Sequence, residues 1–264
     1  MDILTSIFAN DFSNNFFYFH VEILVTIVAI QGFYLFKMLS KPKSQQNHNL
    51  ILKFTTGMLL IFLVTVGPIH EISESYLFSA HMLQHVVLTI IAPPLILAGL
   101  PNNMLDILFN IRLLSRICLF LVHPLVAFFL FNLVYALWHF PVLYNLALNV
   151  HFIHFFEHAL FFSTAFLMWI PLLSPFKQIS VLSPPLKMMY LFFLSVGQII
   201  VFAPITFSEI VLYSRYLNSP VTVITPLQDQ IIGGILMKIS GGLIFLTLFI
   251  VTFFNWAKME ENRV

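Results

Sequence analysis

The chain has 264 residues, of which 59% are hydrophobic and only 9% are charged. Such a composition leaves too little polar surface to cover a soluble domain, so it predicts an all-α, polytopic membrane protein. The net charge of +1 gives no indication of a nucleic-acid partner, and the one cysteine, Cys118, excludes an intrachain disulfide and a paired-cysteine metal motif.

Seven stretches are long and apolar enough to cross a bilayer, since a helix needs about 20 apolar residues to span the hydrocarbon core. In chain order they lie near residues 19–39, 51–70, 77–99, 119–139, 151–172, 186–208 and 230–254. The first stretch has no basic segment before it and no small-residue cleavage motif after it, so we expect a retained helix rather than a signal peptide. Glycine and proline punctuate the joins, which predicts a single seven-helix transmembrane domain over residues 1–264.

The basic residues lie almost entirely on one side of these seven crossings. That side holds Lys37, Lys41, Lys43, Lys53, Arg112, Arg116, Lys177, Lys187, Lys258 and Arg263. Of the other two, Arg215 lies on the opposite side and Lys238 inside the seventh stretch. Because cytoplasmic loops are enriched in Lys and Arg, we expect an outside N-terminus and a cytoplasmic C-terminus.

The histidines segregate to the other side of the predicted membrane. Eight of the ten fall at outer ends of the stretches: His20, His70, His81, His85, His139, His151, His154 and His158. An ionisable residue at membrane depth is costly and by default marks a functional site. When many such residues converge from different helices, the economical interpretation is a metal site.

Two groups of histidines have the spacing of ligands on one helix face. His81 and His85 are four residues apart. His151, His154 and His158 fall within about 60° of one another around a helix. Imidazole without thiolate favours copper or zinc among the metals that it binds. The first-rank ligand candidates are His81, His85, His139, His154 and His158.

Carboxylates near the outer side could orient the imidazoles by hydrogen bonds. Asp229 opens the seventh stretch from that side, so it joins the first rank. Glu157 is expected to point away from the histidine face of its own helix and ranks second. Glu22 and Glu71 are weaker candidates.

Simpler interpretations compete at each histidine. His20 and His70 have the position of amphipathic interface anchors, and His151 that of a solvated helix start, so His70 and His151 rank second. His81, His85, His154 and His158 could instead form hydrogen bonds between helices.

The motifs resemble, in order and spacing, those of the CtaG family of cytochrome c oxidase assembly factors. The matching segments are Leu77-Phe-Ser-Ala-His-Met-Leu-Gln-His85, Ala92-Pro-Pro-Leu95, Gly99-Leu-Pro101, Trp138-His139-Phe-Pro141, the pair His154 and His158, and Asp229-Gln230 with Gly233-Gly234. The resemblance runs over nearly the whole chain from about residue 50.

This resemblance implies a bacterial plasma-membrane protein, not an enzyme, that helps install copper at the histidine-ligated CuB site of haem–copper oxidase. It carries functional roles to His81, His85, His139, His154, His158 and Asp229. The implied partners are subunit I of the oxidase, an extracytoplasmic copper carrier and membrane lipid. A homo-oligomer is left open.

Three other functions compete with a copper-handling assembly factor. A seven-span zinc hydrolase acting on lipid would use three of the histidines as ligands and Asp229 as base. A haem-binding electron carrier would need imidazoles on opposite helices rather than neighbours on one face. A non-metallic assembly scaffold would need the histidines only for stability.

Overall fold

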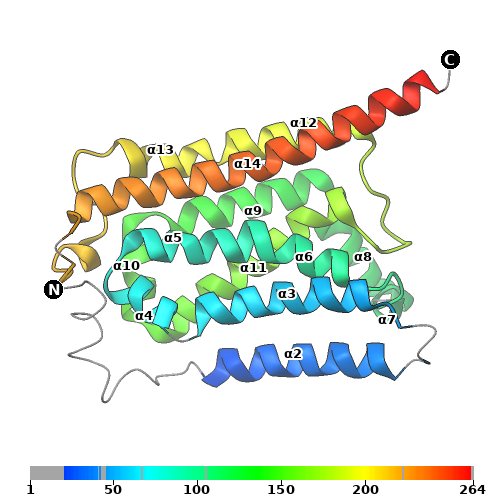
Figure 1. Cartoon of the computed structure of the whole chain (residues 1–264), viewed down its shortest axis with the longest axis horizontal. Helices are drawn as coiled ribbons and strands as arrows, with labels where there is room; N and C mark the ends of the chain where they lie inside the picture. The colour runs from blue at the N-terminus through cyan, green and yellow to red at the C-terminus, as the bar shows by residue number, and fades with distance from the viewer. Residues whose placement is uncertain are drawn as a thin grey trace.

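A computed structural model of the chain describes residues 21–40, 42, 46–66, 68–104, 106–221 and 223–262. The start of the predicted first span, including His20, lies outside these residues, and so do Lys41, Lys43 and Arg263. Within them the chain is helical and has no strand, as the composition predicts, and the long helices run side by side (Figure 1).

The helices follow the predicted order. They are α2 (Val21–Leu39), α3 (His48–Thr65), α4 (Pro68–Ser75), α5 (Phe78–Val86), the π-helical segment η2 (Val87–Ile91), α6 (Ala92–Gly99), α7 (Asp106–Asn110), α8 (Arg112–Leu121), α9 (Pro124–Trp138), α10 (Pro141–Asn149), α11 (His151–Leu173), α12 (Pro184–Gly197), α13 (Ile199–Phe207), the 3-10 helix η3 (Ser214–Tyr216) and α14 (Pro226–Glu261).

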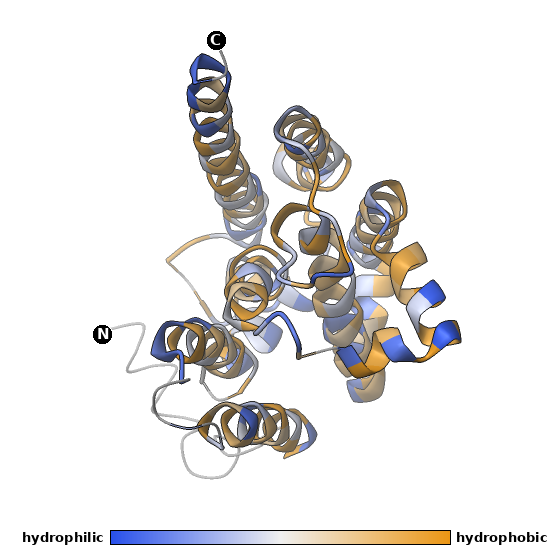
Figure 2. Ribbon diagram, turned by 90° about the vertical axis from the view of Figure 1, so that its right-hand side faces the viewer, coloured by the Kyte–Doolittle hydropathy of each residue, from blue (hydrophilic) through white to orange (hydrophobic). Residues whose placement is uncertain are grey.

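Six helical stretches in the described part of the chain are long and apolar enough to cross a membrane, with Phe78–Gly99 and Pro184–Phe207 each counted as one. A seventh results if α8 and α9, which are bent by 68° at their junction, form one span. The long helices are coloured as hydrophobic over much of their length in Figure 2, and many of their large apolar side chains are exposed. The described residues thus have the six or seven candidate spans of a membrane protein, and the orientation stays a prediction.

The second predicted span is too long at its outer end. α3 ends at Thr65, and Pro68 begins the separate short helix α4. Proline has no N–H with which to continue a helix, but it is favoured at the first helical position. His70 therefore lies on α4 and not at the end of a membrane-spanning helix, which corrects its predicted placement.

The stretch from α5 through η2 to α6 lies at the centre of the bundle, packed against α3, α11 and α14. Pro93 and Pro94 cannot donate to the carbonyls one turn earlier, and the π-helical segment lies directly before them. The carbonyl of Thr89 accepts a hydrogen bond from Trp169 Nε1 at 2.9 Å instead. Such π segments are frequent at functional sites.

Helix α14 fixes the start of α5. Oδ2 of Asp229 accepts the backbone N–H of Phe78 at 2.6 Å, and Oδ1 accepts that of Ser79 at 3.2 Å. Gly233 lies against the Phe78 ring so closely that a Cβ would overlap it. A glycine at this position therefore permits the close packing of α14 against α5.

Two ends of the bundle differ in character. Figure 1 shows α4 and α10 at the end where α5 and α14 begin, with α7 and α8 at the other. The first end carries the histidine-rich segments, whereas α8 at the second end carries Arg112 and Arg116. The predicted segregation of histidines from basic residues is thus present in the fold.

Candidate metal centre

Three imidazoles and one carboxylate meet in the interior of the bundle, between α5 and α11. His81 comes from α5, and His154, Glu157 and His158 come from α11. Each offers one ligand atom, and these atoms lie within 4.8 Å of one another. All four side chains are buried, with His81 and Glu157 at 0% exposure. We call this group, together with His85, the imidazole cluster.

His85 extends the cluster along α5. Its ring centroid lies 4.5 Å from that of His81 and 5.6 Å from that of His158. Its Nε2 lies 3.8 Å from Oε1 of Glu157, too far for a hydrogen bond but close enough for both to hold one cation. Four of the five first-rank histidines thus converge.

Many polar atoms of the cluster have no hydrogen-bond partner. They are Nδ1 and Nε2 of His81, Nε2 of His85, His154 and His158, and both carboxylate oxygens of Glu157. A buried polar atom without a partner costs about 1–3 kcal/mol. These atoms are all imidazole nitrogens or carboxylate oxygens, which can act as metal ligands, and they lie close together. The group therefore fits a metal ion held between them.

His139 supports His85. Nδ1–H of His139 donates to the carbonyl of Tyr135 at 2.6 Å, so Nε2 of a neutral His139 must accept. Nδ1 of His85 lies 3.3 Å from that Nε2 and therefore donates to it. The lone pair of His85 is then at Nε2, the atom that faces Glu157. His139 is placed as a support to a ligand rather than inside the ligand group.

The sequence ranked Asp229 above Glu157 as a site residue, and the structure reverses that ranking. The expectation that Glu157 points away from the histidines is wrong, because Glu157 follows His154 by three residues, and residues at this spacing are neighbours on a helix surface. Since α9, α10, η2 and α6 all contact α11, this part of its surface lies inside the bundle. Asp229 instead caps α5, and its two oxygens accept backbone N–H groups. It holds the helix that carries His81.

Loss of the Asp229 cap is expected to lower stability without removing a ligand. Asp229→Ala leaves two N–H groups of α5 without an acceptor, and a lost cap costs about 0.5–2 kcal/mol. We expect a melting temperature lower by several degrees in detergent, with Asp229→Asn, which keeps one acceptor, in between. Equal melting temperatures of all three proteins would contradict the capping role.

Glu74 is a residue that sequence reasoning missed. Its Oε1 contacts Nδ1 of His154 at 2.6 Å and Nε2 of His70 at 2.8 Å. Burial alone would raise the pKa of the Glu74 carboxyl, but the hydrogen bonds from His154 and His70 lower its pKa well below the usual range. The available signal was the spacing of His70 and Glu74, which places both on one face of a helix.

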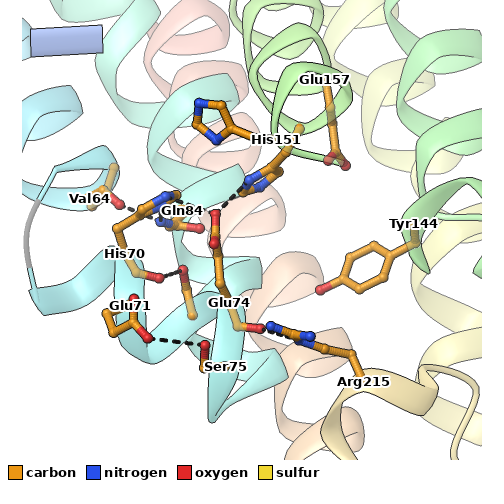
Figure 3. A network of polar contacts seen from close by, with 12 residues as sticks. Val64, His70, Glu71, Glu74, Ser75, Gln84, Tyr144, His151, Glu157 and Arg215 are labelled. Atoms are coloured by element: carbon orange, nitrogen blue, oxygen red, sulfur yellow. Dashed lines mark hydrogen bonds and ion pairs between the residues drawn. The ribbon is translucent and has the colours of Figure 1, made fainter. Parts of the chain in front are cut away.

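The other weaker candidates lie away from the cluster. The side chain of His151 is 58% exposed, and its Nε2 contacts Glu22 Oε1 at 2.6 Å. Glu71 is exposed and accepts a hydrogen bond from Ser75 (Figure 3). The structure brings neither His151 nor Glu71 to the imidazole cluster.

Three tyrosines cover the cluster toward the end of the bundle that carries α4. The hydroxyls of Tyr144 and Tyr216 lie 2.9 Å apart, and Tyr216 donates to the Ser73 carbonyl at 2.7 Å. Tyr213 donates to the carbonyl of His139 at 2.9 Å. Burial raises the pKa of Tyr144 and of Tyr216, so both stay neutral at physiological pH. The ring of Tyr144 lies 5.1 Å from that of His81, so this group of tyrosines packs beside the cluster.

His158 also reaches an apolar cavity on the side of the bundle. The cavity has a volume of about 350 Å³ and lies between α2, α3, α6 and α11, where Ile27, Met58 and Phe162 line it. One imidazole of the cluster thus borders a space that lies among membrane-spanning helices.

A family model described as cytochrome c oxidase caa3 assembly factor (Caa3_CtaG) matches residues 33–259. No curated protein and no solved structure matches the chain significantly.

Proposed function

Because this chain belongs to the cytochrome c oxidase caa3 assembly factor family, we propose that it carries copper in the imidazole cluster and delivers it to the CuB site of the oxidase. The observation that carries the proposal is the set of buried nitrogens and oxygens that lack partners. Copper is the cargo here, and the protein is not an enzyme.

The donor set suits such a cargo. Imidazole and carboxylate bind copper and zinc alike, and no cysteine lies among the cluster residues. Copper is favoured over zinc because the acceptor in the oxidase is itself a copper site built from imidazoles. Moving copper between two imidazole sites changes neither its oxidation state nor its kind of ligand.

The cavity beside His158 supports a lateral transfer. An acceptor that is buried among its own membrane helices must be reached within the bilayer. His158 belongs to the cluster and to the cavity wall, so an incoming imidazole could replace it first. The remaining ligands would follow one by one, each copper–nitrogen bond being replaced by another.

The membrane placement completes the proposal. The distribution of the basic residues favours a cluster in the outer leaflet and a C-terminus in the cytoplasm, and the resemblance to the family favours a bacterial plasma membrane. Copper would then arrive from an extracytoplasmic carrier, and subunit I of the oxidase would receive it. Membrane lipid surrounds both proteins.

The test is the copper content of the oxidase in cells that carry His81→Ala/His85→Ala as their only copy. We expect haem to be retained and the ratio of copper to haem to fall, because the donor no longer loads. His48→Ala, an exposed position at the start of α3, is the matched control. A normal ratio in the double variant would refute copper delivery.

A zinc hydrolase of lipid is the second candidate, favoured by a buried carboxylate beside three imidazoles. Glu157 would serve as its base, since both oxygens of Asp229 are held by backbone N–H groups. Zinc in the purified protein, with hydrolysis of lipid amides or esters that Glu157→Gln abolishes, would favour this function instead.

A further inference from the structure

A chain of hydrogen bonds and ion-pair contacts leads from Gln84 on α5 to His70 and Glu74 on α4 (Figure 3), and from Glu74 on to His154. Gln84 Nε2 donates to the carbonyl of Val64 and to Nδ1 of His70, the latter at 2.9 Å. Nε2 of His70 and Nδ1 of His154 both contact Oε1 of Glu74, at 2.8 and 2.6 Å. Gln84, His70 and His154 are buried.

The direction of each hydrogen bond follows from chemistry. The Val64 carbonyl only accepts, so the atom of Gln84 beside it is the amide nitrogen. That nitrogen only donates, so Nδ1 of His70 must accept and the proton of neutral His70 lies on Nε2. This proton is donated to Glu74.

The same reasoning fixes His154. The Glu74 carboxylate accepts, so Nδ1 of His154 carries its proton and donates to it. The lone pair of neutral His154 then lies on Nε2, the atom that is buried without a partner in the imidazole cluster. Metal-binding histidines are commonly held in this way, with a carboxylate on the other nitrogen.

The geometry also argues against a second metal site. His70, Glu74 and His154 offer ligand atoms within 4.8 Å of one another, which is close enough to hold an ion. However, Nδ1 of His70 is occupied by the Gln84 amide and its Nε2 by a proton. A metal on Nε2 would leave that imidazole without any proton, so these groups support a site rather than form one.

We infer that Gln84, His70 and Glu74 are positioning residues, which preset His154 to bind the cargo through Nε2. The inference rests on the proposed function for the identity of the cargo, but the preset proton positions are a property of the metal-free protein. His139 likewise holds the proton of His85 on Nδ1, from the other side of the cluster. Two ligands would thereby offer their lone pairs before copper arrives.

The experiment is ¹⁵N NMR of metal-free protein with labelled histidines, where the His154 signals are assigned by their loss in His154→Ala. We expect a protonated Nδ1 and a bare Nε2 in the wild type. In Glu74→Leu no acceptor remains beside Nδ1, so the proton is no longer held there and copper affinity should fall about 10- to 100-fold. Glu74→Asp, which keeps an acceptor, should retain the wild-type proton position.

Glu71→Leu is the matched control, since Glu71 lies on the same helix but is exposed. A proton on Nε2 of His154 in the wild type would overturn the inference, whether or not the variants fold. So would Glu74→Leu with unchanged proton position and copper affinity. A wild-type protein with the expected proton position that binds no copper would support the hydrogen-bond chain and refute the proposed function.

Discussion

Alanine at His81 is expected to lower the copper affinity of the purified protein by at least about 100-fold, since even a residue that only supports a ligand is worth 10- to 100-fold. His81 is fully buried, and both of its nitrogens lack partners. Its removal breaks no hydrogen bond of the imidazole side chain, so folding should be affected little beyond the cavity left behind. Competition with a copper chelator, at constant pH, measures the affinity.

His151→Ala is the matched control for this prediction. His151 was part of the same predicted face of α11 as His154 and His158, but its side chain is 58% exposed and pairs with Glu22. We expect wild-type copper affinity in that variant. If His81→Ala bound copper as tightly as His151→Ala, the cluster would not be the binding site.

Leucine at Glu157 is expected to change stability and copper binding in opposite directions. Both carboxylate oxygens are buried without hydrogen-bond partners, and Leu has a similar volume without polar atoms. Replacing an unsatisfied buried polar group with an apolar one should stabilise the metal-free protein by about 1–3 kcal/mol. The same change removes a carboxylate from the ligand group, so copper affinity should fall.

Thermal unfolding in detergent and copper titration, on the same preparations, separate the two effects. Glu71→Leu provides the comparison, because Glu71 is exposed and lies outside the ligand group. A metal-free Glu157→Leu protein that melts at a lower temperature than the wild type would show that Glu157 has a structural partner. Unchanged copper affinity would remove Glu157 from the site.

The helical class and the family could be predicted because both depend on local patterns of the amino-acid sequence. Apolar length indicates membrane-spanning helices, and the spacing of His81 with His85 and of His154 with His158 places each pair on one helix face. These pairs meet in the structure because α5 and the start of α11 lie at the same end of the bundle.

The supporting residues could not be predicted, because their roles depend on packing between helices. Glu157 is an exception, because it follows His154 by three residues, a spacing that makes the two side chains neighbours on a helix surface and that could have placed it in the site. Glu74 reaches His154 only because α3 ends at Thr65 and the separate helix α4, which begins at Pro68, lies beside the cluster. Asp229 was found by its position, but its oxygens hold the start of α5.

The most direct test of copper binding is the metal content of detergent-purified protein after loading with copper, measured by mass spectrometry. The wild type is compared with a variant in which His81, His85, His154 and His158 are all alanine. We predict bound copper in the wild type and none in the variant. Equal copper in both proteins, or no copper in the wild type, would contradict a copper site in the imidazole cluster.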